Sequence, residues 1–210
     1  GMIIMAHGDD KGLKLPPKLA PHQIVIVPII PNDKDKDLVM KVVNQLNDSL
    51  SEFRVIIDDR SEVSPGFKFN EWEQKGVPLR VEVGPKDIEK NTILVSRRDD
   101  ESKNSYPMDD VENTLKKLLD EIQDNLYKNS ENTLKENTTH VESFSELIEV
   151  LNSKKGFVSC FWKENKEDEL KIKEETSATL RCYPLENTDS EKAVNSDSEN
   201  GNFAIFSKAY

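Results

Sequence analysis

The chain has 210 residues, of which 29 are Lys or Arg and 40 are Asp or Glu, and its formal net charge at pH 7 is −11. With 35% hydrophobic residues it supports one sizeable core or two small ones. The net negative charge argues against general electrostatic binding of nucleic acid by the whole chain. Two cysteines, no signal peptide and no spanning apolar run predict a cytoplasmic protein with no membrane role.

Residues 1–6 (GMIIMA) are apolar but too few for a signal sequence or a membrane helix. We expect them to be the tail of a buried strand, so that the chain looks truncated. His7, Asp9 and Asp10 in the following HGDDKG segment allow a metal-dependent hydrolase, although adjacent aspartates in a glycine-bounded loop are more often turn formers. The prolines within residues 16–21 break regular structure and predict a linker.

A module with a buried sheet is expected after the linker. Gln23–Ile30 (QIVIVPII) is a continuous apolar run, which is typical of a strand covered on both faces and indicates an α/β layer. The predicted fold class is α/β, with a mixed sheet flanked by helices. The spacing of apolar residues predicts the further elements as a helix over Leu38–Leu50, a strand over Phe53–Ile57, a helix over Gly66–Lys75, and strands over Val77–Val83 and Thr92–Ser96.

Charged side chains gather on one face of the strand predicted over Val77–Val83. The alternating sequence VPLRVEV places Arg80 and Glu82 opposite the apolar residues, so this face needs a partner. Gly76 is expected to end the preceding helix. Glu73 and Arg80 are therefore predicted to lie on adjacent elements near one surface.

A turn and a local basic surface complete this module. The sequence GPKD at residues 84–87 predicts a turn that leaves Lys86 and Asp87 exposed. Because the whole chain is acidic, an RNA ligand would have to meet a local concentration of cations. A solvated charged face without a ligand is the alternative. The candidate cations are Lys68, Lys75, Arg80, Lys86, Arg97 and Arg98.

The strongest helical pattern lies over Asp109–Tyr127, where an apolar stripe is expected to pack on the sheet. A heptad coiled coil is the competing interpretation. Ser143 and Glu146 form a capping box that predicts a helix over Ser143–Asn152. A small α+β module should follow, with strands over Phe157–Trp162, Ala178–Tyr183 and Phe203–Phe206, a helix over Asp168–Thr176, and a mobile polar loop over Glu186–Asn202.

No catalytic residues are predicted. The three histidines His7, His22 and His140 are widely separated and have no motif-spaced Ser or Cys, and the chain has no glycine motif that cradles phosphate. Cys160 and Cys182 have no histidine nearby, whereas a structural zinc site needs four N or S ligands. We therefore expect no zinc and interpret both cysteines as small buried apolar residues.

The motif DDR...PGFKFNEWEQKGVPLRVEVGPKD, at residues 58–87, resembles the anticodon-binding domain of prolyl-tRNA synthetases in their archaeal or eukaryote-like form. Further matches are HGDDKGLKLPPKLAP near the start, IKEETSATLRCYPLE late in the chain, and the terminal FSKAY. The resemblance implies a class IIa anticodon-binding fold followed by a small zinc-binding-like domain. The implied boundaries are a catalytic-domain tail and linker over 1–20, an anticodon-binding domain over 21–128 and a C-terminal domain over 129–210.

The resemblance also implies roles for individual residues. Glu73 and Arg80 match the pair that reads guanine edges in the family, with an intramolecular salt bridge as the alternative. Lys86 and Asp87 match the family's GPKD turn, a donor beside an acceptor. Phe69 either stacks on an unstacked base, contributing about 1 to 3 kcal/mol, or belongs to the core.

The same resemblance implies a parent enzyme that attaches proline to tRNA(Pro) with ATP and Mg²⁺, as a homodimer. The present chain is expected to bind the anticodon, to lack the catalytic site and to be inactive by itself, and a monomeric state is allowed for it. A stand-alone RNA-binding or regulatory module that reuses the fold is the rival hypothesis. Tyr210 matches the family's terminal tyrosine, which lies against the catalytic domain. Asp168 occupies a position where the family would have another zinc-binding cysteine.

Overall fold

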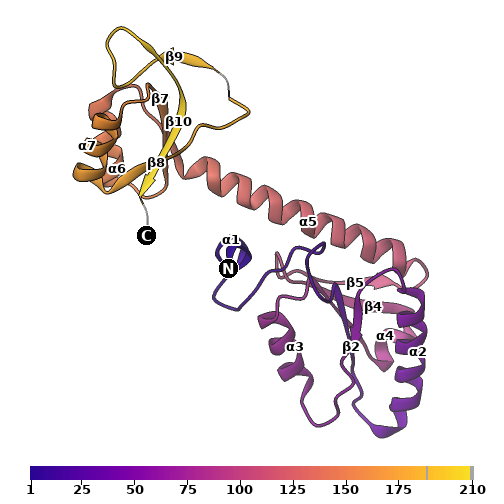
Figure 1. Ribbon diagram of the computed structural model, residues 1–210. Coiled ribbons are helices and arrows are strands. Elements are labelled where there is room, and N and C mark those ends of the chain that lie inside the picture. Colours follow the sequence, from indigo (N-terminus) through magenta and orange to yellow (C-terminus); the bar gives the residue numbers. More distant parts are fainter. Residues whose placement is uncertain (188, 209–210) are drawn as a thin grey trace. The chain divides into compact units, whose positions relative to one another are not determined.

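The computed structural model describes residues 1–187 and 189–208 and divides the chain into two compact units, Gly1–Ser130 and Glu131–Tyr210 (Figure 1). In the described part of the chain, no helix is both long enough and apolar enough to cross a membrane.

A mixed five-stranded sheet forms the centre of the first unit, as predicted. The strand order is β2-β1-β3-β4-β5; β1 is parallel to β2 and β3, whereas β4 runs antiparallel to β3 and β5. All five residues of β1 are buried, which confirms the interpretation of its continuous apolar run. The strands are β1 (Ile24–Pro28), β2 (Val55–Ile57), β3 (Leu79–Val83), β4 (Thr92–Arg97) and β5 (Lys103–Pro107).

Helices cover both faces of this sheet (Figure 1). The helices α2 (Lys36–Ser49) and α5 (Val111–Glu136) pack their apolar residues on one face, in a core that includes Val43, Leu79 and Leu119. The helix α3 (Pro65–Gln74) packs Trp72 on the other face. A short 3-10 helix (Asp33–Asp35) precedes α2, and α4 (Pro85–Glu89) follows β3. The predicted helices of this unit, including the packing of α5 on the sheet, are confirmed.

The ends of α3 follow local rules that the sequence predicts. The hydroxyl of Ser64 accepts a hydrogen bond from the amide of Phe67, and Pro65 occupies the first turn. Gly76 has φ +74, and an added Cβ would lie 2.6 Å from the Cβ of Leu13. Since this φ strains any residue with a side chain, glycine ends the helix here.

Two expectations for the first unit are wrong. Residues 1–6 do not form a strand: Met2–His7 is the helix α1, in which Met2 and Met5 are each 81% exposed. Because no described strand pairs with this segment, its backbone bonds to itself, with the amide of Met5 donating to the carbonyl of Gly1. The edge strand β5 is also absent from the expected elements, because it is mostly exposed and lacks an apolar pattern.

The second unit is a smaller antiparallel-rich sheet with two helices on one face (Figure 1). Its strand order is β6-β7-β10-β8, β9 pairs with β10, and only the β6–β7 pair is parallel. The three-residue strands β6 and β9 were not predicted from the sequence. The elements are β6 (Thr138–His140), α6 (Phe144–Ser153), β7 (Phe157–Trp162), α7 (Lys166–Thr176), β8 (Ala178–Cys182), β9 (Ser190–Lys192) and β10 (Asn200–Lys208).

The predicted cap of α6 is present. The hydroxyl of Ser143 accepts a hydrogen bond from the amide of Glu146 at 3.2 Å, and the carboxylate of Glu146 accepts one from the amide of Glu142 at 3.1 Å. The reciprocal bond therefore goes to the residue before the cap rather than to the cap itself.

The prediction of a mobile loop over Glu186–Asn202 is wrong for its second half. Ala193 is buried, and the amide of Val194 donates to the carbonyl of Phe161 at 2.8 Å. The side chain of Asn195 accepts from the amide of Lys163 and donates to the Lys163 carbonyl at 2.9 Å and to Asp168 at 3.0 Å. Hydrogen bonds to a distant segment thus order a stretch that is too polar to order itself by burial.

We predict that Asn195→Ala destabilises the second unit by roughly 1 to 3 kcal/mol, because the half-buried polar groups of Lys163 and Asp168 lose their partner. Hydrogen exchange measured by NMR should show faster exchange of the Val194 amide. The exposed Ser198→Ala serves as the control and should leave that rate unchanged. Equal protection of Val194 in both variants would contradict this account of the loop.

Candidate nucleic-acid interface

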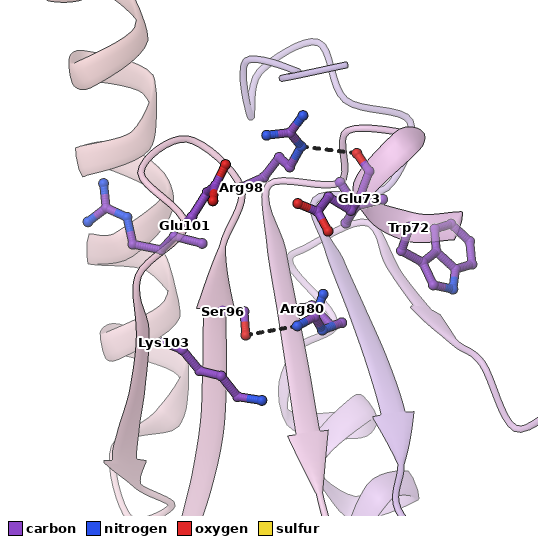
Figure 2. A pocket seen from close by; sticks show the side chains of 9 residues that line it. Trp72, Glu73, Arg80, Ser96, Arg98, Glu101 and Lys103 are labelled. Atoms are coloured by element: carbon purple, nitrogen blue, oxygen red, sulfur yellow. Dashed lines mark hydrogen bonds between the residues drawn. The ribbon is translucent and has the colours of Figure 1, made fainter. Parts of the chain in front are cut away.

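A hollow of about 190 Å³ lies where α3 ends and the strands β3, β4 and β5 come together (Figure 2). Glu73 and Arg80 both line it, so the prediction that they share one surface is confirmed. The complete lining is Trp72, Glu73, Val77, Arg80, Ser96, Arg97, Arg98, Glu101 and Lys103.

Arg80 is held on several sides but retains free donors. Its Nε and Nη2 atoms each donate to Oε1 of Glu82 at 3.3 Å, and Nη2 also donates to Oγ of Ser96 at 3.1 Å. The guanidinium carbon lies 4.2 Å from the centroid of the Phe69 ring, within range of a cation–π contact. Nη1 has no hydrogen-bond partner among the described residues, so its two N–H groups can bind a ligand.

Glu82 is the anion that fixes Arg80. Its side chain is 7% exposed and also accepts from the Nζ atom of Lys103, at 2.9 Å to one oxygen and 3.0 Å to the other. Lys103 was not among the predicted cations, because it lies on the unpredicted strand β5. A buried carboxylate between two cations makes this corner of the hollow rigid.

Glu73 provides an acceptor on the other side of the hollow (Figure 2). Its carboxylate lies 3.8 Å from Nζ of Lys11, and neither oxygen accepts a hydrogen bond from a described residue. No ion pair joins Glu73 to Arg80 in the described chain; the intramolecular ion pairs of these residues are instead Glu73 with Lys11 and Arg80 with Glu82. One side chain therefore offers free acceptors and the other free donors to the same space.

Arg98 connects the hollow to the loop before the linker. Its Nε donates to the backbone carbonyl of Glu73 at 3.0 Å, and its two terminal nitrogens donate to both carboxylate oxygens of Asp9, at 3.0 and 2.6 Å. These bonds hold the pKa of Asp9 well below its ordinary value. Asp9 also accepts from the amides of Lys11 and Gly12, which confirms the turn-former interpretation.

The structure gives the metal-enzyme alternative no support. No group of three or more histidine, cysteine or acidic side chains in the described residues is arranged to hold a metal ion. The carboxylate of Asp9 is instead occupied by Arg98 and by Nζ of Lys14, at 3.1 Å.

The predicted basic surface is wrong for three of its six residues. Lys68 is buried, and its Nζ donates to the carbonyl of Asp58 at 3.0 Å. Arg98 is buried against Asp9, and Arg97 forms a two-point ion pair with Asp99 at 3.1 and 2.8 Å. Lys68 and Arg98 bind acidic residues 10 and 89 positions away, and Arg97 binds one that is two positions away, so none of the three is a free surface cation. Lys75 and Lys86 are exposed, although Lys75 pairs with Glu71.

Asp58 is the anion beneath α3. Its carboxylate accepts from the indole nitrogen of Trp72 at 2.7 Å and from two nitrogens of Arg60 at 2.8 and 2.7 Å. The hydrogen bonds from Arg60, with the indole bond and the nearby charge of Lys68, outweigh burial and lower the pKa of Asp58 to about 2.

Other predicted site residues lie elsewhere. The predicted turn at residues 84–87 is present as the start of α4, and Lys86 is exposed as expected, but Asp87 is half-buried; neither residue lines the hollow. Oδ2 of Asp87 accepts from the amide of Gly84 at 3.0 Å and caps the helix. Phe69 is half-buried beneath Arg80. Tyr210 lies outside the described residues.

Cys160 and Cys182 face opposite sides of the second sheet. Cys160 pairs in register with Ala204 and Cys182 with Ile205, and neighbouring residues of a strand point to opposite faces. Cys160 is buried, which raises the pKa of its thiol to about 12, whereas Cys182 is exposed. The buried-thiol prediction is therefore right for Cys160 and wrong for Cys182.

Comparison with known protein families gives two matches. The profile described as "Anticodon binding domain" matches residues 23–118, and the profile described as "Prolyl-tRNA synthetase, C-terminal" matches residues 144–210.

Among curated proteins, the proline–tRNA ligase of Roseiflexus sp. (strain RS-1) is 43% identical over 100% of this chain and 44% of its own length. That of Natranaerobius thermophilus is 44% identical over 89% of this chain and 38% of its own length. A crystal structure of prolyl-tRNA synthetase from Cryptosporidium parvum, complexed with L-proline and AMP, is also similar, with a TM-score of 0.89 and 38% sequence identity. The match covers 99% of the present chain and 45% of the Cryptosporidium chain. The chain thus spans about two fifths of the length of these curated relatives.

The pH dependence of stability should reveal the Asp58 contacts. A carboxyl whose pKa is lowered on folding stabilises the protein above its unfolded pKa, and this stability is lost as the pH falls through the folded pKa. Asp58→Asn should therefore lower the free energy of unfolding by roughly 2 kcal/mol at pH 7, with the difference from the unmodified chain shrinking between about pH 4 and pH 2.

Urea unfolding followed through the Trp72 indole proton by NMR measures this difference. The neighbouring exposed residue supplies the control, Asp59→Asn, which should show no such pH-dependent difference. A constant difference between Asp58→Asn and the unmodified chain across this pH range would contradict the assignment.

The absence of zinc stays a prediction. Elemental analysis of the purified chain should find no stoichiometric zinc, and a chelator should leave the melting temperature unchanged, because a structural zinc ion contributes folding energy directly. One zinc ion per chain would show that the two cysteines are not the only ligands available.

Proposed function

Because the chain belongs to the prolyl-tRNA synthetase family, of which it carries the anticodon-binding domain and the C-terminal domain, we propose that it recognises the anticodon of tRNA(Pro). For the parent protein we propose proline–tRNA ligase activity with ATP and Mg²⁺. We also propose that the parent protein is cytoplasmic and homodimeric. The present chain binds RNA but is inactive alone. It contains no cofactor site in this proposal.

The single observation that supports anticodon recognition is the pairing of free polar groups in the hollow. The carboxylate of Glu73 can accept from the N1–H and N2–H groups of guanine, and the Nη1 donors of Arg80 can reach O6 or N7. An unstacked single-stranded base exposes these edges. Guanine presents two adjacent donors next to an acceptor, which complements this arrangement.

The surrounding contacts keep Arg80 ready for this role. Glu82 and Ser96 bind one side of the guanidinium, and Phe69 lies against its plane. An arginine already fixed by such contacts loses little conformational freedom when it binds a ligand. We infer that Phe69 acts mainly by supporting Arg80.

The remaining site residues have separate proposed roles. Lys86 is exposed and can meet a phosphate outside the hollow, whereas Asp87 supports the backbone of this turn as the cap of α4. For Tyr210 the proposal is contact with the catalytic domain of the parent enzyme. This contact is tested by measuring proline activation by the full-length enzyme before and after deletion of Tyr210, at matched stability. Unchanged kinetics would exclude a catalytic role for Tyr210.

Replacing Arg80 should relax base discrimination. The probe is an anticodon stem-loop RNA with the proline anticodon, compared by fluorescence anisotropy with the same RNA in which adenine replaces both anticodon guanines. The unmodified chain should prefer the guanine-containing RNA, and Arg80→Ala should reduce this preference by about 1 to 3 kcal/mol because the contact to one base is lost.

The matched control is Lys41→Ala, which removes an exposed cation from α2 on the opposite face of the sheet. This change should leave the preference for guanine intact. Recognition at the hollow would be refuted if the unmodified chain bound both RNAs equally, or if both variants lost discrimination to the same extent. The rival hypothesis of a stand-alone module predicts that the full reading frame encodes no catalytic domain.

A further inference from the structure

A second cavity, of about 830 Å³, lies in the second unit, next to the end of α6 and the ends of β8 and β10. Four of the residues that line it are cations, Lys154, Lys155, Arg181 and Lys208, and none of its described lining residues carries a carboxylate. This composition is unexpected in a chain with 40 acidic and 29 basic residues.

The four cations come from three separate parts of the fold. Lys154 and Lys155 follow the last residue of α6, and Lys208 is at the end of β10. Arg181 is an extra residue on β8, because the pairing with β10 shifts from Ile205–Cys182 to Phe206–Leu180. Such a bulge redirects the side chain. Tertiary structure, and not a basic run in the sequence, therefore assembles the cluster.

None of the four cations forms an ion pair with a described residue, although other lysines of the unit do, such as Lys163 with Glu199. All four side chains are exposed. Nε of Arg181 donates to the carbonyl of Ser207 at 3.2 Å, which orients the guanidinium and leaves its terminal nitrogens without described partners. Like charges held together in this way repel each other, and a bound anion would relieve the repulsion.

The dipole of α6 explains only part of the cluster. Cations beyond the last turn of a helix offset the partial negative charge of its carbonyls, and this accounts for Lys154 or Lys155. The effect falls off within one turn, and it gives no reason for Arg181 and Lys208, which belong to strands.

The cavity also offers an aromatic surface. Phe157 lines it with 37% of its surface exposed, next to the buried Leu151. Cations around an exposed aromatic ring are the combination that binds single-stranded nucleic acid, because the cations meet phosphates while a base stacks on the ring. The cavity is also much larger than a single phosphate ion requires.

We propose that this cavity binds the sugar–phosphate backbone of a single RNA strand, with one base against Phe157. The contact is independent of base identity and is separate from the guanine hollow of the first unit. The chain would then hold RNA at two places by different means, reading a base edge in one unit and neutralising phosphates in the other.

The test uses the complete 210-residue chain and a fluorescent twelve-nucleotide oligouridylate, which contains no guanine. The triple variant Lys154→Gln/Lys155→Gln/Lys208→Gln should weaken binding about tenfold or more, and the slope of log K against log salt should fall by about 2, since each neutralised phosphate of a single strand contributes about 0.7. Phe157→Ala should weaken binding without changing the salt slope.

Two controls isolate the cavity. Lys166→Gln/Lys173→Gln/Lys192→Gln makes the same change of charge at exposed lysines elsewhere in the unit and should bind like the unmodified chain. Arg80→Ala should also leave oligouridylate binding unchanged, so that failure of the guanine site and failure of this proposal are distinguishable.

Three results would overturn the proposal. The first is equal loss of affinity in both triple variants, which would indicate an effect of net charge alone. The second is oligouridylate binding that Arg80→Ala abolishes and the first triple variant preserves. The third is oligouridylate binding that occurs only after residues 209–210 have been deleted. Such a result would mean that the end of the chain, and not RNA, occupies the cavity in the complete chain.

Discussion

The ion pair between Arg98 and Asp9 determines the form of the hollow where α3 meets β3, β4 and β5. One guanidinium bonds to both oxygens of Asp9 and to the backbone carbonyl of Glu73, so it joins the loop before the linker, the last turn of α3 and the end of β4. Such a two-point bond between charged groups is strong and directional. The backbone that carries Glu73 is therefore fixed, and its carboxylate, 3.8 Å from Nζ of Lys11, accepts no hydrogen bond from a described residue.

The proposed RNA site is compatible with an acidic chain because the cations of the chain are distributed selectively. Asp58, Asp99 and Asp9 bind the cations that would otherwise form a broad basic surface. What remains open in the first unit is a matched pair of donor and acceptor, which favours selectivity over general affinity. In the second unit, four cations without a described ion-pair partner line one cavity.

Local patterns were sufficient for most of the fold. The continuous apolar run predicted the buried strand β1, helical spacing predicted α2 and α5, and capping residues predicted the starts of α3 and α6. They failed for β5, β6 and β9, in which no residue is fully buried, because such strands exist only through pairing with a neighbour. Residues 1–6 were assigned to a strand because their apolar composition does not distinguish a strand from a helix.

The sequence by itself determined the family, the mixed sheet, and the nearness of Glu73 to Arg80, since each depends on motifs or on adjacent elements. Only the tertiary structure decided which charges are free. Lys68 and Arg98 are buried and Arg80 keeps open donors, although all three occur in similar charged motifs. The reason is that a charge is neutralised by whichever distant segment packs against it, and neither composition nor spacing contains that information.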